Sequence, residues 1–362
     1  MKNKLFKLLT LTLALLMLLP FAAACKKQEE TPSQTSDDTE STQASETTAP
    51  PKAGVSLDLT KEWEALNGAN TLVQGCLVIN TKFAQEHPNE VAKFLEDYKA
   101  SVETVKSGSE EAINMIVNAG ILPKAAIAKK ALPGCNICYI AGNDMKSVMN
   151  TFCEKIFNYD KTSIGGAMPT DAFYYTASGD ASKADSALEM KVYALNGTTA
   201  LGMAQMIDNV KNDKATMNYN ISLHTAADEI TGAIVKGECA IAALPTNVAV
   251  KLFNKSEGKL QLLALNTLGV LYLLENGDET IDSLDDLKGK TIYLPGAGSN
   301  PEYITAALLT SAGLKIGEDV TLDTTTYNSP DALQTAFAAG KAPLAVLPEP
   351  KVTVALTAAN TQ

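Results

Sequence analysis

Arginine is absent from this chain of 362 residues, so all 30 of its basic side chains are lysines. Proteins use the planar guanidinium group of arginine to hold a carboxylate or a phosphate with two parallel hydrogen bonds. Any anion bound here must therefore be held by backbone N–H groups, by hydroxyls or by lysine. The 41 acidic residues bring the formal net charge to −11, which disfavours binding to nucleic acid or to an anionic lipid surface.

Histidine is nearly as scarce, with only His87 and His224 in the chain. This nearly excludes a histidine-rich metal site and a histidine-dependent catalytic triad. The pair Cys135 and Cys138 has neither a second cysteine pair nor a histidine at the spacing of zinc ligands. We therefore expect buried free thiols, no metal, no cofactor and no catalytic residues.

The one long apolar run lies at the N-terminus, in residues 8–24, after three lysines within the first seven residues. This run of seventeen residues is almost purely apolar but short for a membrane-spanning helix, and Ala22-Ala23-Ala24 is typical of a signal-peptide cleavage site. Residues 1–24 are therefore predicted to be an export signal. This prediction places the mature protein outside the cytoplasm.

Cys25 directly follows the predicted cleavage site and resembles the lipobox cysteine of bacterial lipoproteins, although Ala22 stands where leucine is usual. The resemblance implies a lipid on Cys25 and a location on the extracytoplasmic face of a bacterial membrane. Plain secretion with an incidental cysteine is the alternative. Residues 25–51 contain no aromatic or large aliphatic side chain, so they are predicted to be a flexible tether that buries no core.

Short apolar segments alternate with helical patterns through the rest of the chain. The expected strands are 55–59, 72–79, 190–195, 220–224, 240–244, 260–265, 270–274, 290–294 and 343–347. The main expected helices are 88–106, 109–119, 124–131, 143–159, 226–236 and 330–339. Such alternation predicts an α/β fold whose mainly parallel sheets are covered by helices on both faces. The roughly 310 residues outside the N-terminal segment are enough for two lobes.

Six stretches of the chain resemble the solute-binding lipoproteins of ABC importers, in the branch that binds nitrate, sulfonates, taurine and thiamine precursors. They are ALNGTTALGMAQMI, GAIVKGECAIAALPTNVA, LLALNTLGVLYLLENG, IDSLDDLKGKTIYLPGAGSNPEYI, ALQTAFAAGKAPLAVLPEPKVTVAL and LVQGCLVINTKFAQEHPNEVAKFLEDY. The resemblance implies the two-lobed type II periplasmic-binding-protein fold, with interlobe crossing strands that join the lobes.

The order of these stretches differs from that family, in which the segment similar to 190–362 precedes the one similar to 52–175. The chain therefore looks circularly permuted. Residues 52–72 and 277–362 are expected to form one lobe, and residues 73–177 with 178–276 the other. The polar segment 178–189 is expected to be an exposed bridging linker with few contacts.

Three strand-to-helix turns are the main candidates for a ligand site. In open α/β sheets, ligands lie at the carboxyl ends of the strands, against helix N-termini. The alternative is that these turns merely cap helices. The turns are Gly197-Thr198-Thr199, Pro245-Thr246-Asn247 and the glycine-rich turn that contains Gly296, Gly298, Ser299 and Asn300.

Four single residues are further candidates. Thr267 lies where the family crosses between its lobes, and it could contact ligand or simply bend the chain. Tyr303 could stack on a planar ligand or cap a helix. Glu349 could accept hydrogen bonds from an amine or amide, or act as a charge at a helix N-terminus. Trp63, the only tryptophan, is expected to be a packing anchor.

The resemblance implies a monomeric, non-enzymatic receptor that delivers a small organic molecule or oxyanion to an ABC permease. An anion would be held by Thr198, Thr199, Ser299 and backbone amides. A neutral heteroaromatic ligand such as a pyrimidine would instead use Asn247, Asn300, Glu349 and a tyrosine. Two alternatives remain: a ligand-sensing or adhesive surface lipoprotein without a cognate permease, and an enzyme similar to the thiamine-pyrimidine synthases.

Overall fold

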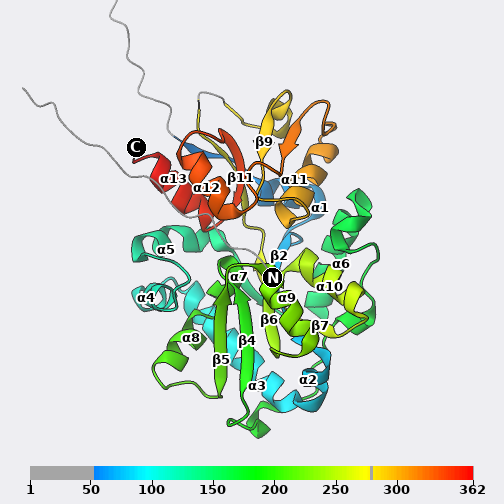
Figure 1. Ribbon diagram of the computed structural model, residues 1–362, viewed down its shortest axis with the longest axis vertical. Coiled ribbons are helices and arrows are strands. Elements are labelled where there is room, and N and C mark those ends of the chain that lie inside the picture. Colours follow the sequence, from blue (N-terminus) through cyan, green and yellow to red (C-terminus); the bar gives the residue numbers. More distant parts are fainter. Residues whose placement is uncertain (1–52, 278–279, 362) are drawn as a thin grey trace, which may run out of the picture. The chain divides into compact units, whose positions relative to one another are not determined.

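The computed structural model describes residues 53–277 and 280–361, and Figure 1 labels their elements. The predicted signal, Cys25 and the predicted tether lie outside these residues. Within the described part of the chain, no helix combines the length and apolar character needed to cross a membrane.

One sheet has five strands in the order β1-β8-β11-β9-β10. Strands β9, β10 and β11 are parallel, and β8 runs antiparallel to its neighbours β1 and β11. The strands are β1 (Gly54–Asp58), β8 (Leu271–Glu275), β9 (Thr291–Tyr293), β10 (Thr321–Asp323) and β11 (Leu344–Pro348). The helices of this lobe are α1 (Leu59–Asn67), α11 (Asn300–Ser311), α12 (Pro330–Ala338) and α13 (Lys351–Ala359).

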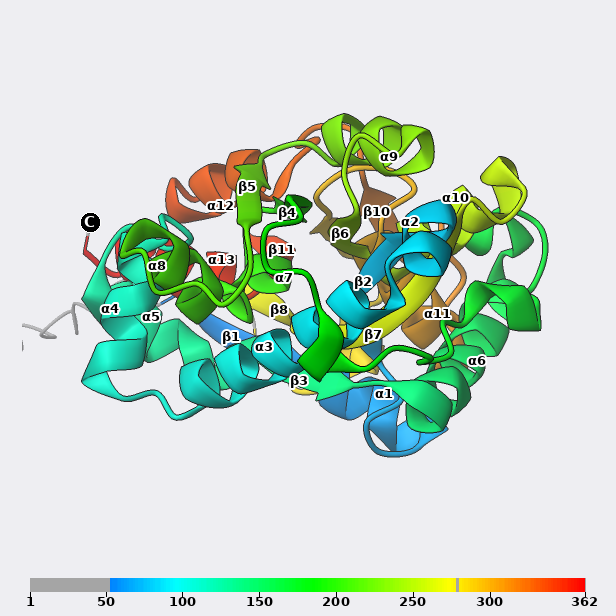
Figure 2. The same ribbon diagram turned by 90° about the horizontal axis from the view of Figure 1, so that it is seen from below.

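The second sheet has six strands in the order β3-β7-β2-β6-β4-β5, with β5, β4 and β6 parallel and β2 antiparallel to β6 and β7. The strands are β2 (Val73–Asn80), β3 (Ile137–Ile140), β4 (Met190–Leu195), β5 (Tyr219–His224), β6 (Ile241–Pro245) and β7 (Leu260–Leu268). The helices of this lobe are α2 (Thr81–Glu86), α3 (Pro88–Lys106), α4 (Glu110–Asn118), α5 (Ala125–Ala131), α6 (Gly142–Tyr159), α7 (Thr198–Leu201), α8 (Ala204–Lys211), α9 (Ala227–Lys236) and α10 (Thr246–Ser256). Figure 2 shows these helices on both faces of the sheet.

The two sheets share one strand order. The parallel strands β4, β5 and β6 are called first, second and third here in their order along the chain, and β7, which comes next, is called fourth. In space these strands lie in the order β5, β4, β6, β2, β7, that is second, first, third, crossing strand and fourth. Strand β2 is the crossing strand, because the chain enters it from the other lobe. The parallel strands β9, β10 and β11 of the other sheet are numbered in the same way. In the other sheet β10, β9, β11, β8 and β1 occupy the same places, with β8 as the crossing strand.

The two-lobed α/β architecture expected from the sequence is confirmed. The sheets are mixed and not mainly parallel, because the crossing strands and the strands beside them pair antiparallel, and apolar runs do not indicate strand direction.

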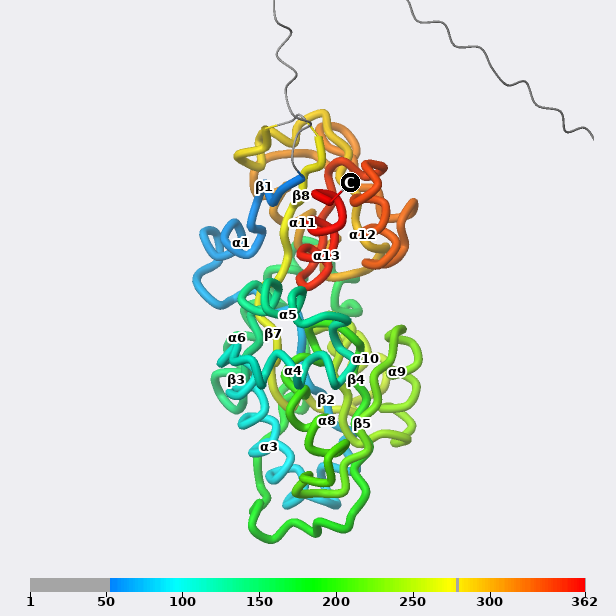
Figure 3. The backbone as a smooth tube through the Cα atoms, turned by 90° about the vertical axis from the view of Figure 1, so that its left-hand side faces the viewer, coloured from blue at the N-terminus to red at the C-terminus, as the bar shows by residue number. Residues whose placement is uncertain are grey.

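The boundary between the lobes differs from the expected one at residue 276. Strand β7 ends at Leu268 in the six-stranded sheet, and β8 begins at Leu271 in the five-stranded sheet (Figure 3). The apolar run 270–274 predicts a strand correctly but does not indicate which sheet that strand joins. The crossing therefore falls at Gly269 and Val270.

Residues from opposite ends of the described chain are neighbours in space. The side-chain amide of Asn360 donates a hydrogen bond to the carbonyl oxygen of Ala53, at 2.9 Å. Strands β1 and β11 also lie in the same sheet, with β8 between them. The first and last segments of the described chain thus complete one lobe together.

The segment 178–189 has more contacts than expected, because it packs along the start of α3. The backbone N–H of Asp180 donates to the Asn89 side chain at 2.9 Å, and that of Asp185 donates to Glu90 at 2.9 Å. Gly179 approaches Pro88 so closely that a Cβ atom would lie 1.8 Å from its carbonyl oxygen. Hydrogen bonding by α3 could not be predicted from the polar composition of this segment.

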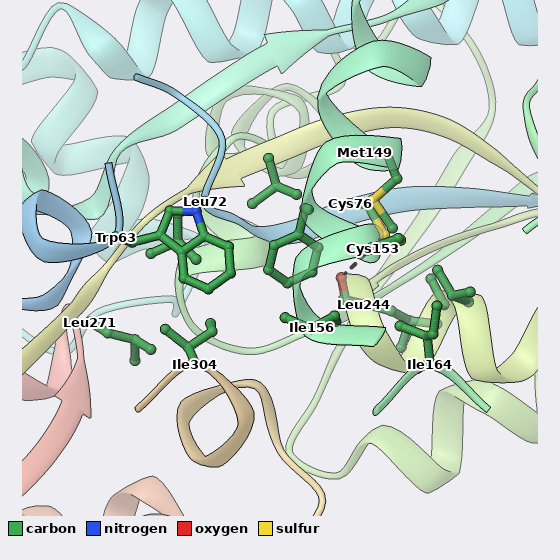
Figure 4. Packing of buried hydrophobic residues seen from close by; sticks show 14 of the residues in the cluster. Trp63, Leu72, Cys76, Met149, Cys153, Ile156, Ile164, Leu244, Leu271 and Ile304 are labelled. Carbon is green, nitrogen blue, oxygen red and sulfur yellow. Dashed lines mark hydrogen bonds between the residues drawn. The ribbon is translucent and has the colours of Figure 1, made fainter. Parts of the chain in front are cut away.

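One apolar cluster extends across both lobes (Figure 4). Trp63 of α1 is 1% exposed, and its ring centre lies 5.9 Å from that of Phe152 of α6. The expectation that Trp63 is a packing anchor is confirmed. The described cysteines are buried free thiols, as expected: Cys76, Cys135, Cys138, Cys153 and Cys239.

Candidate functional site between the lobes

The carboxyl ends of the parallel strands meet where the two lobes touch. The turn after β4 contacts the turn after β11, where the Thr198 hydroxyl donates to the carbonyl oxygen of Glu349 at 2.6 Å. The turn after β6 contacts the turn after β9, where the Asn247 amide donates to the carbonyl oxygen of Gly298 at 3.2 Å. Each contact thus joins the first strand of one sheet to the third strand of the other. The three predicted turns therefore lie at one interlobe contact.

Asn300 connects the glycine-rich turn to the crossing strand β2. Its amide nitrogen lies 3.2 Å from the Thr246 hydroxyl and 3.3 Å from the carbonyl oxygen of Gln74. The Gln74 side chain in turn accepts a hydrogen bond from the Val270 N–H at 2.6 Å, so it joins the two crossing segments. Gln74 was not among the residues predicted from the sequence. A buried polar residue within the apolar run LVQGCLVIN was the available signal.

Gly75 lies against a polar cluster at the end of the six-stranded sheet. A Cβ atom at this position would lie 2.5 Å from Asn266 Oδ1, 2.7 Å from Thr267 Oγ1 and 2.8 Å from Thr199 Cγ2. The Thr267 hydroxyl donates to Asn266 Oδ1 at 3.0 Å, and the Asn266 amide donates to the carbonyl oxygen of Thr199 at 3.0 Å. Thr267 is therefore a buried member of the site's base. Asn266, a polar residue in an apolar strand, was also missed.

Lysine and glutamate side chains surround the glycine-rich turn. Lys251 Nζ lies 3.3 Å from the carbonyl oxygen of Gly298 and 4.9 Å from the centre of the Tyr303 ring. The Glu302 carboxylate accepts a hydrogen bond from the Gly298 N–H at 2.5 Å. Gly298 has a φ of +72°, a left-handed conformation that favours glycine. Lys251 follows Asn247 by four residues on one helix face, a spacing that could have indicated it.

Glu349 is buried, and its carboxylate is held by the helix that it precedes. Its oxygens accept hydrogen bonds from the Thr353 N–H at 3.1 Å and the Thr353 hydroxyl at 2.8 Å. Burial raises the pKa of Glu349, while the hydrogen bonds from Thr353 and the charge of Lys130 oppose this rise. The carboxylate is thus positioned by Thr353 at the interlobe contact.

A cavity of about 240 Å³ lies beside these contacts, with walls from both lobes. One lobe contributes Asn196, Gly197 and Thr225, and the other contributes Gln334, Pro350 and the ion pair between Asp331 and Lys351. Of the predicted site residues, Gly197 lines this cavity. Six of the others meet across the interlobe contact and not at this cavity: Thr198, Thr246, Asn247, Gly298, Asn300 and Glu349.

A hydrogen-bond chain on β5 joins a serine, a histidine and a glutamate. Ser222 Oγ lies 2.9 Å from His224 Nε2, and His224 Nδ1 lies 3.0 Å from Glu229. This arrangement was not predicted from the sequence. The neighbouring Thr225 lines the interlobe cavity, whereas Ser222 and His224 do not. These hydrogen bonds therefore hold the end of the edge strand β5, beside the site.

No family profile and no curated protein matches this chain. Among residues 53–277 and 280–361, no group of three or more histidine, cysteine, aspartate and glutamate side chains is placed to hold a metal ion.

Two solved structures are similar to parts of the chain. One is the alkanesulfonate-binding protein SsuA from Xanthomonas axonopodis pv. citri bound to MOPS, with 18% identity over 46% of this chain and a TM-score of 0.32. The other is an ABC transporter from Parabacteroides distasonis, with 24% identity over 48% of this chain and a TM-score of 0.33. The match spans 56% of each of those proteins.

Proposed function

We propose that this chain is an extracytoplasmic solute-binding protein, which captures a small molecule between its two lobes and delivers it to an ABC permease. The observation that carries the proposal is the meeting of strand ends from two sheets with one strand order. Two crossing segments join the lobes, one at Gly269 and Val270 and one ahead of β2. Such a pair of segments is a hinge about which the lobes can open and close.

Closure around a ligand would replace some of the hydrogen bonds that now join the lobes directly. The bonds between Thr198 and Glu349, between Asn247 and Gly298, and between Asn300 and Gln74 must break when the lobes open. A ligand that binds only between closed lobes shifts the population toward the closed form. A permease can then distinguish loaded from empty protein by the lobe arrangement. The protein itself needs no catalytic group for this role.

Native mass spectrometry tests the capture of a small molecule, and uptake measurements test its delivery. We expect protein purified under gentle conditions to carry an added small mass that unfolding releases. We also expect deletion of the gene to abolish uptake of that molecule. Binding without an uptake defect would favour a surface sensor or adhesin, whereas conversion of the molecule by the purified protein would favour an enzyme.

We further infer that the chain is circularly permuted relative to this family. If Thr361 were joined to Ala53, one half would run through β4, β5, β6 and β7 of the six-stranded sheet and then β8, which crosses to the other sheet. The other half would run through β9, β10, β11 and β1 of the five-stranded sheet and then β2, which crosses back. The contact between Asn360 and Ala53 supports this reading, because it brings the ends to be joined together. Nearby ends at the surface are the condition under which permutation is tolerated.

The lipid anchor at Cys25 is the final part of the proposal, and it rests on the signal-like sequence that precedes it. The Cys25→Ser variant should move from the membrane fraction to the soluble extracytoplasmic fraction. Retention of this variant in the membrane fraction would contradict lipidation at Cys25. We propose that the anchored protein acts as a monomer.

A further inference from the structure

We infer that the interlobe site takes a neutral or cationic small molecule with at least two N–H or O–H donors, and not a sulfonate or other oxyanion. This inference rests on the proposed function and specifies its ligand class. It follows from an inventory of the hydrogen-bond donors and acceptors that the two lobes bring together.

The hydroxyl hydrogens of the site already donate hydrogen bonds within the protein. A serine or threonine hydroxyl has a single O–H to donate but can accept through its lone pairs. Five hydroxyls donate to oxygen atoms of the protein itself: Thr198 to Glu349, Thr199 to Leu195, Thr246 to Val73, Thr267 to Asn266 and Ser299 to Gly296. Four of these bonds lie within one lobe and persist when the lobes open, so those four hydroxyls offer a ligand acceptors and no donors. The Thr198 bond joins the two lobes, so opening frees that hydroxyl.

Two buried amide oxygens have no hydrogen-bond partner. Asn247 and Asn300 are 0% and 4% exposed, and Oδ1 of each is buried without a partner. The nitrogen atom of each amide donates to a backbone carbonyl oxygen, which identifies the opposite atom as the oxygen. Buried acceptors of this kind are rare in proteins and call for a specific explanation. Donors on a ligand would satisfy both.

The charges at the site also disfavour an anion. The Glu302 carboxylate occupies the N–H of Gly298, and the Glu349 carboxylate occupies the N–H of Thr353. The N–H groups that could hold an oxyanion near α11 and α13 are therefore partly taken by acidic side chains. Among the nearby cations, the Lys251 ammonium lies against the Gly298 carbonyl oxygen and the Tyr303 ring, and Lys130 acts on the Glu349 carboxylate. Lys351 is paired with Asp331.

The two unpartnered oxygens belong to opposite lobes, since Asn247 begins α10 and Asn300 begins α11. A ligand that donates to both would connect the lobes. Donor recognition and lobe closure would then be a single event, which is what a transport receptor requires.

Calorimetric titration of the full chain with two sets of probes tests the ligand class. The donor set is 2-aminopyrimidine, acetamidine, N-methylurea and 1,3-diaminopropane, and the oxyanion set is methanesulfonate, ethanesulfonate, nitrate and sulfate. We expect binding from at least one member of the donor set and from no oxyanion. Binding of an oxyanion alone would overturn the inference and leave the proposed function standing. Binding of neither set would overturn the inference, whereas the proposed function is overturned only by the mass-spectrometry and uptake tests given above.

Matched variants locate the binding event. Asn247→Leu and Asn300→Leu remove the unpartnered oxygens and should each weaken binding of the donor probe at least tenfold, since its donors then lose their acceptor. Asn114→Leu, on the exposed surface of α4, should leave binding unchanged. If a leucine variant does not fold by circular dichroism, Asn300→Asp serves in its place. That variant keeps an acceptor, so it should retain binding of a cationic donor probe. Unchanged binding in both folded leucine variants would overturn the inference.

Discussion

At the scale of single residues, Gly75 is the place where the crossing strand passes closest to the polar base of the site. Gly75→Ala would bring a methyl group to 2.5 Å from Asn266 Oδ1 and 2.7 Å from Thr267 Oγ1, so these side chains must move. We expect the free energy of unfolding to fall by about 1–3 kcal/mol, measured by urea denaturation. Ligand binding should weaken as well, because the displaced residues support Thr199.

Gly232 provides the matched control for that substitution. It lies inside α9, and nothing lies within 4 Å of where its Cβ would be. Gly232→Ala should therefore raise the free energy of unfolding by about 0.5–1 kcal/mol, because alanine loses less backbone entropy in a helix. Equal effects from the two substitutions would contradict the role assigned to the close packing at Gly75.

The protonation of Glu349 should make the free energy of unfolding depend on pH. Burial raises the pKa of its carboxyl group above the ordinary value of 4.5, so the folded chain binds this proton more tightly than the unfolded chain does. The stability that protonated Glu349 contributes is thus complete below pH 4.5 and is lost as the pH rises through the raised pKa. Relative to Glu349→Gln, the wild type should lose at most about 1.4 kcal/mol per pH unit in this window.

Urea denaturation curves at several pH values measure this difference. Thr353→Val removes the hydroxyl that hydrogen bonds to the carboxylate, so it should extend the window to higher pH. Parallel stability curves for the wild type and Glu349→Gln would show that the carboxyl group has the same proton affinity in both states.

At the scale of secondary-structure elements, α1 of one lobe packs on α6 of the other through Trp63 and Phe152. Both side chains are buried, and Trp63 is the only tryptophan in the chain. Phe152→Ala should cost about 3–5 kcal/mol of stability, because it leaves a cavity in the core. It should also move the Trp63 emission maximum to longer wavelength, because water gains access to the indole. Unchanged emission in a folded Phe152→Ala variant would contradict this packing.

The positions of the strands and helices could largely be predicted from the sequence. The sheet that each strand joins and the turns that contact one another could not. The apolar run 270–274 predicts β8 within one residue, but its sheet depends on the crossing at Gly269, which no periodicity reveals. Asn247 and Asn300 come from separate predicted turns, and the structure places these turns in contact. Their pairing through Gly298 and Thr246 depends on residues more than fifty positions apart. Local patterns determine elements, and long-range packing determines which elements meet.

At the scale of the whole molecule, the nearness of Ala53 and Asn360 predicts that the chain can be rejoined in another order. A variant that links Thr361 to Ala53 with a few glycines and serines, and opens between Ala177 and Ser178, should fold. Its circular dichroism spectrum should match that of the wild type, and its thermal midpoint should lie within a few degrees. A change of 1 kcal/mol shifts the midpoint by only about 2–4 °C in chains of 150–250 residues.

The control opens the same joined chain between Cys76 and Leu77. That cut divides β2, which pairs with both β6 and β7 in the middle of the six-stranded sheet. This second variant should be insoluble or unfolded. Failure of the first variant together with success of the second would show that the ends are not interchangeable.

Because the crossing strand β8 lies far along the chain from its neighbour β1, the nascent chain must wait for β8 before this lobe can fold. Strand β1 pairs with β8, and the bonded side chains Ser56 and Glu275 are 219 residues apart. At ribosomal speeds of about 5–20 residues per second, the partner of β1 is made roughly 10 to 40 s after β1 itself. During that interval the early apolar strands have no native neighbour, and only a chaperone or a translocation channel can shield them from aggregation.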